Sequence, residues 1–335
     1  MTKFKSIIKI FSFSLAIIGT TIGAGFVSGK EIANFFNVYG NFAYIMAIVM
    51  GIVYFLTLKL FFKCSSNNPF NNNFLDYIIA FCQLISLTAM IAGLNSVLSN
   101  YFGSKTLFYI VIILCFVIIL CGLKGLTRTN ALLMPILLTF ILFTGISALF
   151  LHSNFNIEVF DSSPIKIASY IFIYIGLDLF SCYPICIILG KTTSKKERNI
   201  IASIVGVAIS ILISCYLVSV LKKDTNYMYF DLPILNYTID HFDNLYIFAC
   251  IMLCIGIITT LLSNGFILYD FSRKHFRKNS FIGFLLFFCI AFILSFVGFS
   301  TIVEFFYPIN GLIGIILVCV LIFKTKKGEW INILL

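Results

Sequence analysis

Ten apolar blocks, each about the length needed to cross a lipid bilayer, run along the chain. Short polar segments separate them, such as the asparagine-rich 67–73 and the basic 191–198. The pattern predicts ten membrane-spanning helices, at residues 7–36, 40–62, 74–100, 106–123, 129–151, 165–190, 199–221, 244–270, 280–299 and 302–323. The expected fold class is therefore an all-α polytopic membrane protein.

The longest connector between these blocks is 222–243. It contains a short apolar piece, 232–239, with aspartates on both sides. The piece is too short to span a bilayer, and we expect it to form an interfacial or re-entrant helix that caps one face.

Composition agrees with this class and excludes a soluble domain. The 335 residues are 61% hydrophobic and 11% charged, with a mean hydropathy of +1.07. Most of the eleven cysteines lie inside apolar runs, where they behave as small buried hydrophobes rather than as a disulfide framework. The lysines before the first apolar run resemble the start of a signal peptide. That run lacks a small-residue cleavage site and continues to Phe36, so we expect a retained first span.

The basic residues predict the orientation of the chain. Ten spans place both termini on one side, and eighteen of the 23 lysines and arginines fall on that side. The other side keeps Lys30, Lys105, Lys166, Lys222 and Lys223. Positive residues mark the cytoplasmic face, so we expect both termini in the cytoplasm. Because the basic residues are scattered over separate short loops, the net charge of +10 does not indicate nucleic-acid binding.

The spans divide into two halves of five, about 1–155 and 156–327, within a single transmembrane domain. Five is an odd number, so the second half enters the membrane inverted relative to the first. Glycines interrupt the first span at 19–31, and Gly176, Asp178 and Pro184 interrupt the first span of the second half. Interrupted helices at corresponding positions of inverted halves are the best indication in a sequence of a transporter's binding site.

The glycines of the first span allow two interpretations. Gly19 with Gly23, and Gly25 with Gly29, each form a G-x-x-x-G motif, which is typical of close helix packing. The adjacent Lys30-Glu31 pair and the interrupted counterpart in the second half favour local unwinding instead. An unwound helix offers amide groups to a carboxylate and carbonyl oxygens to Na⁺.

Asp178 is a carboxylate in the middle of the sixth predicted span, near Tyr174 and Gly176. A charge at this depth costs several kcal/mol, about 3 on insertion scales, unless it has a partner or water. Two roles fit: a structural cap on a kinked helix, or a ligand for a substrate amine, a coupling cation or a proton.

Thr259 and Thr260 follow Gly256 by three and four residues in the eighth predicted span. Hydroxyls in membrane helices commonly bond back to carbonyls of their own helix. The alternative is that Gly256 permits a close approach while both hydroxyls turn to a hard cation, which prefers oxygen ligands.

Lys30 and Glu304 fall near the outer ends of the first and tenth predicted spans. Opposite charges at this depth tend to pair, although each side chain can also reach the interface separately. Glu31 is a rival partner for Lys30.

The remaining polar residues of the spans indicate no further site. Amide side chains are expected to form hydrogen bonds between helices, at Gln83, Asn95, Asn264 and Asn310. The three histidines lie in separate loops and form no metal site. The chain contains no P-loop, H-E-x-x-H or G-x-S-x-G motif, so we expect no enzyme activity.

The segment 19–31, GTTIGAGFVSGKE, resembles the first span of the YkvI-type bacterial membrane proteins. That family is similar to the amino acid–polyamine–organocation transporters, which have the leucine-transporter (LeuT) fold. The resemblance covers the first span well and the sixth loosely. It implies that both spans unwind around the substrate, with these substrate-binding positions: Thr20, Gly23, Ala24, Gly25, Tyr174, Gly176 and Asp178.

The same resemblance implies an ion site and a gate. The carbonyls of Gly19 and Ile22, with Gly256, Thr259 and Thr260, match a sodium site of that fold. Lys30 with Glu304 matches its outer gate. The fifth span has no intramembrane lysine of the kind that replaces sodium in some proton-coupled relatives, which favours Na⁺ over H⁺.

The function expected from these observations is secondary active transport in the bacterial cytoplasmic membrane. The solute is small and zwitterionic, such as an amino acid, the coupling ion is Na⁺ or H⁺, and no other cofactor is expected. A nutrient receptor on the same scaffold is the alternative, since it would bind solute without accumulating it. A purely structural subunit would do neither. The sequence gives no indication of the oligomeric state.

Overall fold

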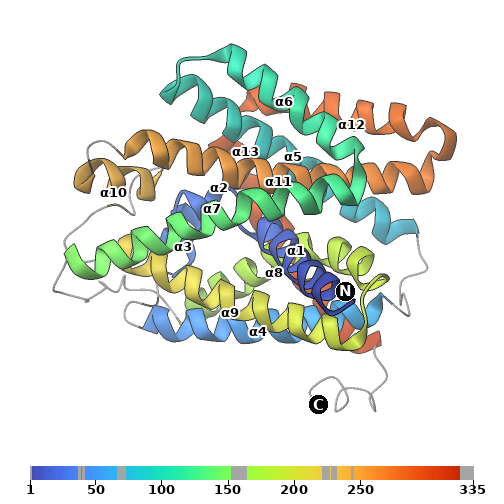
Figure 1. Cartoon of the computed structure of the whole chain (residues 1–335), viewed down its shortest axis with the longest axis horizontal. Helices are drawn as coiled ribbons and strands as arrows, with labels where there is room; N and C mark the ends of the chain where they lie inside the picture. Colours follow the sequence, from blue (N-terminus) through green and yellow to red (C-terminus); the bar gives the residue numbers. More distant parts are fainter. Residues whose placement is uncertain are drawn as a thin grey trace.

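The computed structural model describes residues 2–36, 39, 42–65, 73–151, 164–220, 227, 232–242 and 245–324. Helices account for almost all of these residues, and no strand occurs among them. The α-helices are α1 (Thr2–Thr21), α2 (Ala24–Val27), α3 (Lys30–Phe36), α4 (Ala43–Cys64), α5 (Asn73–Tyr101), α6 (Lys105–Leu120), α7 (Gly122–Leu151), α8 (Pro164–Gly190), α9 (Lys195–Val220), α10 (Pro233–His241), α11 (Tyr246–His275), α12 (Ser280–Leu294) and α13 (Phe299–Lys324) (Figure 1).

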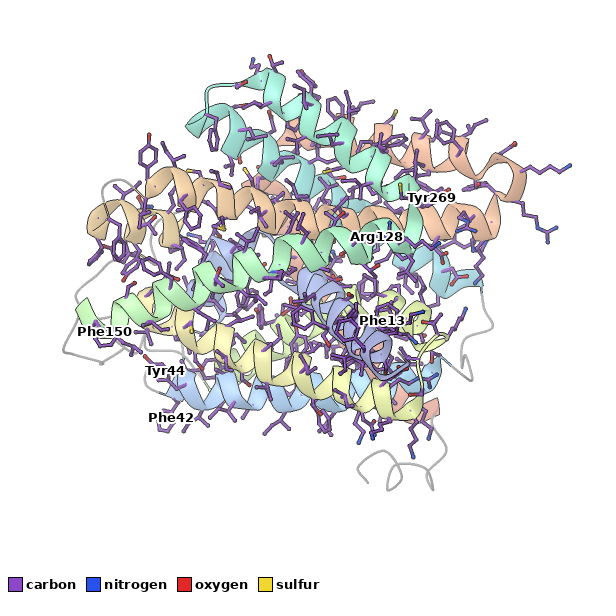
Figure 2. The ribbon with its side chains drawn as sticks, in the orientation of Figure 1. Phe13, Phe42, Tyr44, Arg128, Phe150 and Tyr269 are labelled. Atoms are coloured by element: carbon purple, nitrogen blue, oxygen red, sulfur yellow. The ribbon has the colours of Figure 1, made fainter. Side chains whose placement is uncertain are left out.

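The helices have the length and surface of a multi-pass membrane protein. Nine of those described are long and apolar enough to span a bilayer, and α6, with 16 residues, is a shorter apolar helix. At 1.5 Å per residue α6 is about 24 Å long, slightly less than the hydrocarbon core. Large apolar side chains cover the outside: Phe42 and Phe150 are 67% and 87% exposed and lie at the edge of the molecule in Figure 2. This surface suits lipid rather than water.

Helix packing pairs the two predicted halves. The helices α4 and α9 lie side by side along one flank, α6 and α12 lie on the opposite flank, and α1 passes between them (Figure 1). The packing of α1 on α7 corresponds to that of α8 on α13, and α5 packs on α11. This is the pairing expected from two inverted five-helix units, although the unit boundaries at 1–155 and 156–327 remain a prediction.

The first span is interrupted, as predicted. The helix α1 ends at Thr21, and Gly23 is extended at φ −89° and ψ −171° before the single turn of α2. A second interruption follows at Ser28 and Gly29, where Gly29 has φ +81°. A side chain is strained in that left-handed region, so Gly29 allows α3 to continue in a new direction.

The predicted break in the sixth span is wrong, because α8 is one continuous helix from Pro164 to Gly190. Gly176 lies instead where α8 crosses α13: a Cβ built on it would lie 2.0 Å from the carbonyl oxygen of Gly311. A Cβ on Gly314 would lie 1.9 Å from the carbonyl oxygen of Gly176. The glycine therefore permits close backbone contact between two intact helices, the role typical of small residues in membranes.

One further helix boundary differs from the prediction, and one predicted short helix is confirmed. The predicted spans 106–123 and 129–151 meet at Gly122, which has φ +65°, so α6 ends at Leu120 and the next helix starts seven residues earlier than expected. The short helix expected at 232–239 is confirmed as α10, which packs on α9 and α11.

Candidate functional site

The break in α1 exposes backbone oxygens next to α11. In a continuous helix the amide of Gly23 would donate to the carbonyl of Gly19, but here it donates to Thr21 at 3.0 Å. The carbonyl of Gly19 has therefore lost its helical donor. Instead it lies 3.1 Å from Oγ1 of Thr260, and the carbonyl of Ile22 lies 3.0 Å from the same atom.

Thr260 cannot satisfy all the oxygens around it. Its Oγ1 also lies 3.2 Å from the carbonyl of Gly256, so three carbonyl oxygens surround one hydroxyl. A hydroxyl has a single proton and can donate to one of them at a time. The cluster is buried, with Thr260 at 6% exposure. Converging neutral oxygens without enough protons are the arrangement that a hard cation stabilises.

The other predicted members of this cluster are also in place. Thr259 donates to the carbonyl of Gly256 at 2.9 Å and is fully buried. A Cβ on Gly256 would lie 2.3 Å from Cγ2 of Val27, so this glycine lets α2 pack closely against α11. The structure thus brings together all five residues predicted as the Na⁺ site.

The outer side of the break is closed by other helices. Tyr216 on α9 donates to the carbonyl of Val27 at 3.1 Å, and the amide of Ile234 at the start of α10 donates to the carbonyl of Ser28 at 2.9 Å. The Ser28 hydroxyl donates to Gly25 at 3.0 Å. The carbonyls that must share one hydroxyl proton thus gather beside Thr260, while those of Gly25, Val27 and Ser28 each have a donor.

Asp178 has one strong partner. It is 6% exposed, and the hydroxyl of Tyr54 on α4 donates to its Oδ2 at 2.6 Å. A short hydrogen bond of this kind is typical of an ionised acceptor. Tyr174 lies one turn earlier on the same helix, 1% exposed, and its hydroxyl has no hydrogen bond of normal geometry to any described residue.

The other predicted substrate-binding residues fall into separate environments. Thr20 is turned to α11, where its hydroxyl lies 3.2 Å from Oγ of Ser263. Gly25 faces the carboxylate of Glu31, since a Cβ on it would lie 2.3 Å from Oε1. Gly23 faces Thr260, and Ala24 is buried beside the break. Gly176 lies at the α8–α13 crossing and not in this group.

The predicted outer gate is only half described. Lys30 begins α3, is partly buried, and its amide donates to the hydroxyl of Ser28 at 3.3 Å. Glu304 lies on α13, and its side chain is outside the part of the chain that the structure describes. The pairing therefore stays a prediction.

Three buried amide side chains differ from what the sequence predicts or were not considered there, and one of them, Asn130, lies beside Gly19. Asn130 of α7 is fully buried, and its Nδ2 lies 2.8 Å from the Cβ position of Gly19. Asn130, Gln83 and Asn264 have no hydrogen-bond partner among the described residues, so the expected helix–helix bonds of Gln83 and Asn264 are absent there. Asn310 does bond across helices, to Ser86 at 3.4 Å. Asn130 could have been noticed in the sequence as an amide side chain inside an apolar span.

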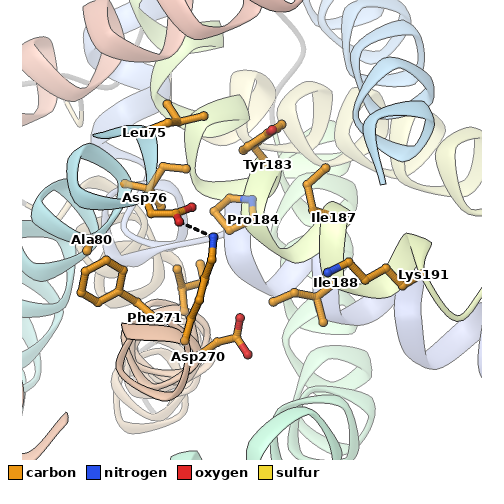
Figure 3. A pocket seen from close by; sticks show the side chains of 13 residues that line it. Leu75, Asp76, Ala80, Tyr183, Pro184, Ile187, Ile188, Lys191, Asp270 and Phe271 are labelled. Atoms are coloured by element: carbon orange, nitrogen blue, oxygen red, sulfur yellow. Dashed lines mark hydrogen bonds and ion pairs between the residues drawn. The ribbon is translucent and has the colours of Figure 1, made fainter. Parts of the chain in front are cut away.

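A second feature lies at the end predicted to be cytoplasmic. A cavity of about 160 Å³ opens between α5, α8 and α11, beyond Pro184 (Figure 3). Asp76 forms an ion pair with Lys274 across it and lies 3.3 Å from Nε2 of His275. Asp270 also lines the cavity. The pair joins the first turn of α5 to the last turn of α11, so it holds the two helices together at this end.

Comparisons with known proteins agree with this architecture. No family model matches the chain. A relative, the uncharacterized protein YyaD of Bacillus subtilis (strain 168), is 26% identical over 345 residues, covering 94% of this chain and 97% of the relative. Among solved structures, MhsT in complex with L-phenylalanine matches with a TM-score of 0.65 and 12% identity, over 96% of this chain and 91% of MhsT.

A second solved structure is Mhp1, a nucleobase-cation-symport-1 family transporter in a closed conformation with bromovinylhydantoin bound. Its TM-score is 0.59 at 14% identity, over 85% of this chain and 71% of Mhp1. The chain has the fold of these transporters. The LeuT-type architecture implied by the resemblance is thus confirmed, whereas membership of the YkvI family stays a prediction.

Proposed function

We propose that the chain is a secondary active transporter of a small solute, coupled to Na⁺, in the bacterial cytoplasmic membrane with both termini in the cytoplasm. The observation that carries this proposal is the oxygen cluster at the break in α1. Five neutral oxygen-bearing residues from two helices meet there, and their protons cannot satisfy their acceptors.

The residues present fit a sodium ion. The ligands would be the carbonyls of Gly19, Ile22 and Gly256 and the hydroxyls of Thr259 and Thr260, and all are oxygens, as a hard cation prefers. The bound ion would supply a positive charge that ties α1 to α11. Because the break lies in the first span, an ion bound beside Thr260 would favour one arrangement of that span. The affinity for the solute would therefore rise when the ion binds.

The similarity to MhsT and Mhp1 supports transport as the general activity through the shared fold. The buried cluster supports ion coupling, since a plain anchor has no need of a broken helix at this depth. A zwitterionic amino acid is the solute expected from the resemblance. Because Asp178 is a buried carboxylate, the net charge of the solute matters for this choice.

Reconstitution of the full chain into proteoliposomes tests the proposal. An inward Na⁺ gradient should drive accumulation of a solute identified by thermal stabilisation, and dissipating the gradient should abolish accumulation. Thr260→Val should remove the Na⁺ response, while Thr260→Ser, which keeps the hydroxyl, should retain it. If the chain binds the solute but never accumulates it, the protein is a receptor. If only a proton gradient drives accumulation, Asp178 becomes the candidate for the coupling residue.

A further inference from the structure

Two buried carboxylates lie on helices that pack against each other in the interior. Glu31 is on α3, just after the break, Asp178 is on α8, and both residues are 6% exposed. One turn further along α3, the ring of Phe35 lies 5.2 Å from the ring of Tyr174, which is one turn before Asp178, so this contact brings the two acidic turns together. The two belong to the two segments that the repeat predicts as counterparts.

The polar atoms around this pair are incompletely satisfied. Asp178 accepts the Tyr54 hydrogen bond, but Oε2 of Glu31 has no partner among the described residues. The Tyr174 hydroxyl, one turn before Asp178 on α8, is also buried and also has no hydrogen-bond partner there. Two buried polar groups of different chemistry thus lack hydrogen bonds where α3 packs on α8.

No lysine, arginine or histidine in the described part of the chain forms an ion pair with either carboxylate. Removing two carboxylates from water without a counter-charge is costly, and buried charges in proteins are paired or bind an ion.

The surroundings are poorly suited to a second anion. The continuous α8 retains its own backbone hydrogen bonds, so it offers no exposed amides to a carboxylate beside Asp178. The turn α2 has only four residues and provides no extended dipole. A neutral zwitterion has a single positive charge for the two carboxylates and adds a carboxylate of its own, whereas a basic amino acid brings a second cation.

We propose that Glu31 and Asp178, flanked by the Tyr54 and Tyr174 hydroxyls, bind the ammonium or guanidinium group of a solute with net positive charge. This inference rests on the proposed function, because it names the class of solute that the transporter carries. Carboxylates pair with planar guanidinium or compact ammonium groups, and the tyrosine hydroxyls supply acceptors that orient the donor. The expected solute is a basic amino acid or a related amine rather than a neutral one.

Matched pairs of solutes test the charge requirement. The purified full-length chain in lipid nanodiscs would be melted with arginine or citrulline, and with lysine or norleucine, in saturating Na⁺. Each pair has nearly the same shape and differs in the terminal cation. Arginine and lysine should raise the melting temperature, since a ligand of the folded state stabilises it, and their neutral partners should not.

Variants then connect the effect to the acid pair. Glu31→Gln and Asp178→Asn should each raise the concentration of arginine for half-maximal stabilisation by about tenfold or more, as loss of a charged hydrogen-bonding partner predicts. Glu31→Asp should recover part of the affinity. The control is Asp240→Asn on α10, an exposed carboxylate outside the core, which should leave the response unchanged. The ligand-free melting temperature of each variant shows whether it folds.

The outcomes separate this inference from the proposed function. Stabilisation by citrulline and norleucine equal to that by arginine and lysine would overturn the cationic solute, even if Na⁺-driven uptake of a neutral amino acid were found. Unchanged arginine affinity in folded Glu31→Gln and Asp178→Asn would overturn the site. Stabilisation by the cationic solutes without any accumulation in proteoliposomes would support the acid pair and refute transport.

Discussion

The first span and α8 carry similar sequence signals yet have different structures. Both contain glycine and polar residues within an apolar helix, and both lie at corresponding positions of the two halves. At the first, the helix opens at Gly23, and Thr260 of α11 lies against the freed carbonyls. At the second, the helix is continuous, and Gly176 contacts the backbone of α13.

A glycine in a membrane helix therefore does not by itself break the helix. An opened turn must have its carbonyls and amides satisfied by neighbours, because lipid offers none. Near Gly23 the neighbour is the hydroxyl of Thr260, which can donate to a carbonyl. Near Gly176 the neighbour is the backbone of α13 at Gly311. The partner helix therefore decides whether the glycine lies at an opened turn or at a packing contact.

The largest expected effect concerns the packing contact. Gly176→Ala places a methyl group 2.0 Å from the Gly311 carbonyl, so α8 and α13 must separate. Overpacking of this kind costs about 1–3 kcal/mol, and a backbone neighbour that cannot rotate away puts this site near the upper end. The measurement is the thermal unfolding of the purified protein in detergent.

Ser181→Ala is the matched control on the same helix, because among the described residues the Ser181 hydroxyl bonds to the Leu177 carbonyl of its own helix, at 3.3 Å. It should melt close to the wild type. If Gly176→Ala also melts like the wild type, α8 and α13 do not cross as closely as in this structure. Gly176 would then again be a candidate for a break in the helix.

The next effect concerns the support of Asp178. Tyr54→Phe removes the 2.6 Å hydrogen bond to the buried carboxylate and should lower the free energy of unfolding by about 2 kcal/mol, since bonds to charged groups are worth more than neutral ones. Tyr77→Phe, at a tyrosine that is 55% exposed, is the control. An unfolding free energy equal to the wild type's would mean that the Tyr54 hydroxyl does not hold Asp178.

A smaller effect is expected at Gly25 in the first span. A methyl group on Gly25 would lie 2.3 Å from Oε1 of Glu31, a flexible side chain that can turn away, whereas one on Gly23 would lie 3.5 Å from Oγ1 of Thr260, an ordinary contact. Gly25→Ala should therefore weaken binding of the cationic solute by about tenfold, equivalent to about 1.4 kcal/mol, with little change in stability.

Ser203→Ala, at an exposed serine of α9 whose hydroxyl bonds to the Asn199 carbonyl at 3.0 Å, is the control and should bind within about twofold of the wild type, a difference of well under 1 kcal/mol. Titration of arginine by thermal shift measures both variants. Equal affinities would show that the Gly25–Glu31 contact has no part in solute binding.

The smallest effect is expected at the predicted gate. An ion pair between Lys30 and Glu304 at the outer rim is partly hydrated and worth about 1 kcal/mol or less. Neutralising either residue should slow transport more than it weakens binding, and the double charge reversal, Lys30→Glu with Glu304→Lys, should recover part of the rate. A double variant no faster than the slower single variant would favour Glu31 as the partner of Lys30.

Local sequence pattern was sufficient to predict the ten helices and the break in the first span, because hydropathy repeats at bilayer length and glycines cluster at 19–29. The spacing of Gly256, Thr259 and Thr260 places them near one helical turn, but their meeting with the carbonyls of Gly19 and Ile22 was implied only by the resemblance to transporters of the LeuT fold. The continuity of α8 was not predictable in this way, because it depends on Gly311 and Gly314, far along the chain.

The acid pair was missed for the same physical reason. Glu31 follows Lys30 in the sequence, which suggested a local charge pair, and Asp178 was considered alone. Their approach depends on how α3 packs against α8, a tertiary contact that no periodicity records. The buried amide of Asn130 against Gly19 is another contact of this kind.

Direct binding of radiolabelled sodium to the purified chain tests the central claim, that the opened turn of α1 and Thr260 form an ion site. Saturable binding is expected in the wild type and in Thr260→Ser, and its loss in Thr260→Val, with the melting temperatures showing that all three proteins are folded. Saturable binding that persists unchanged in Thr260→Val, or no saturable binding in the wild type, would contradict it.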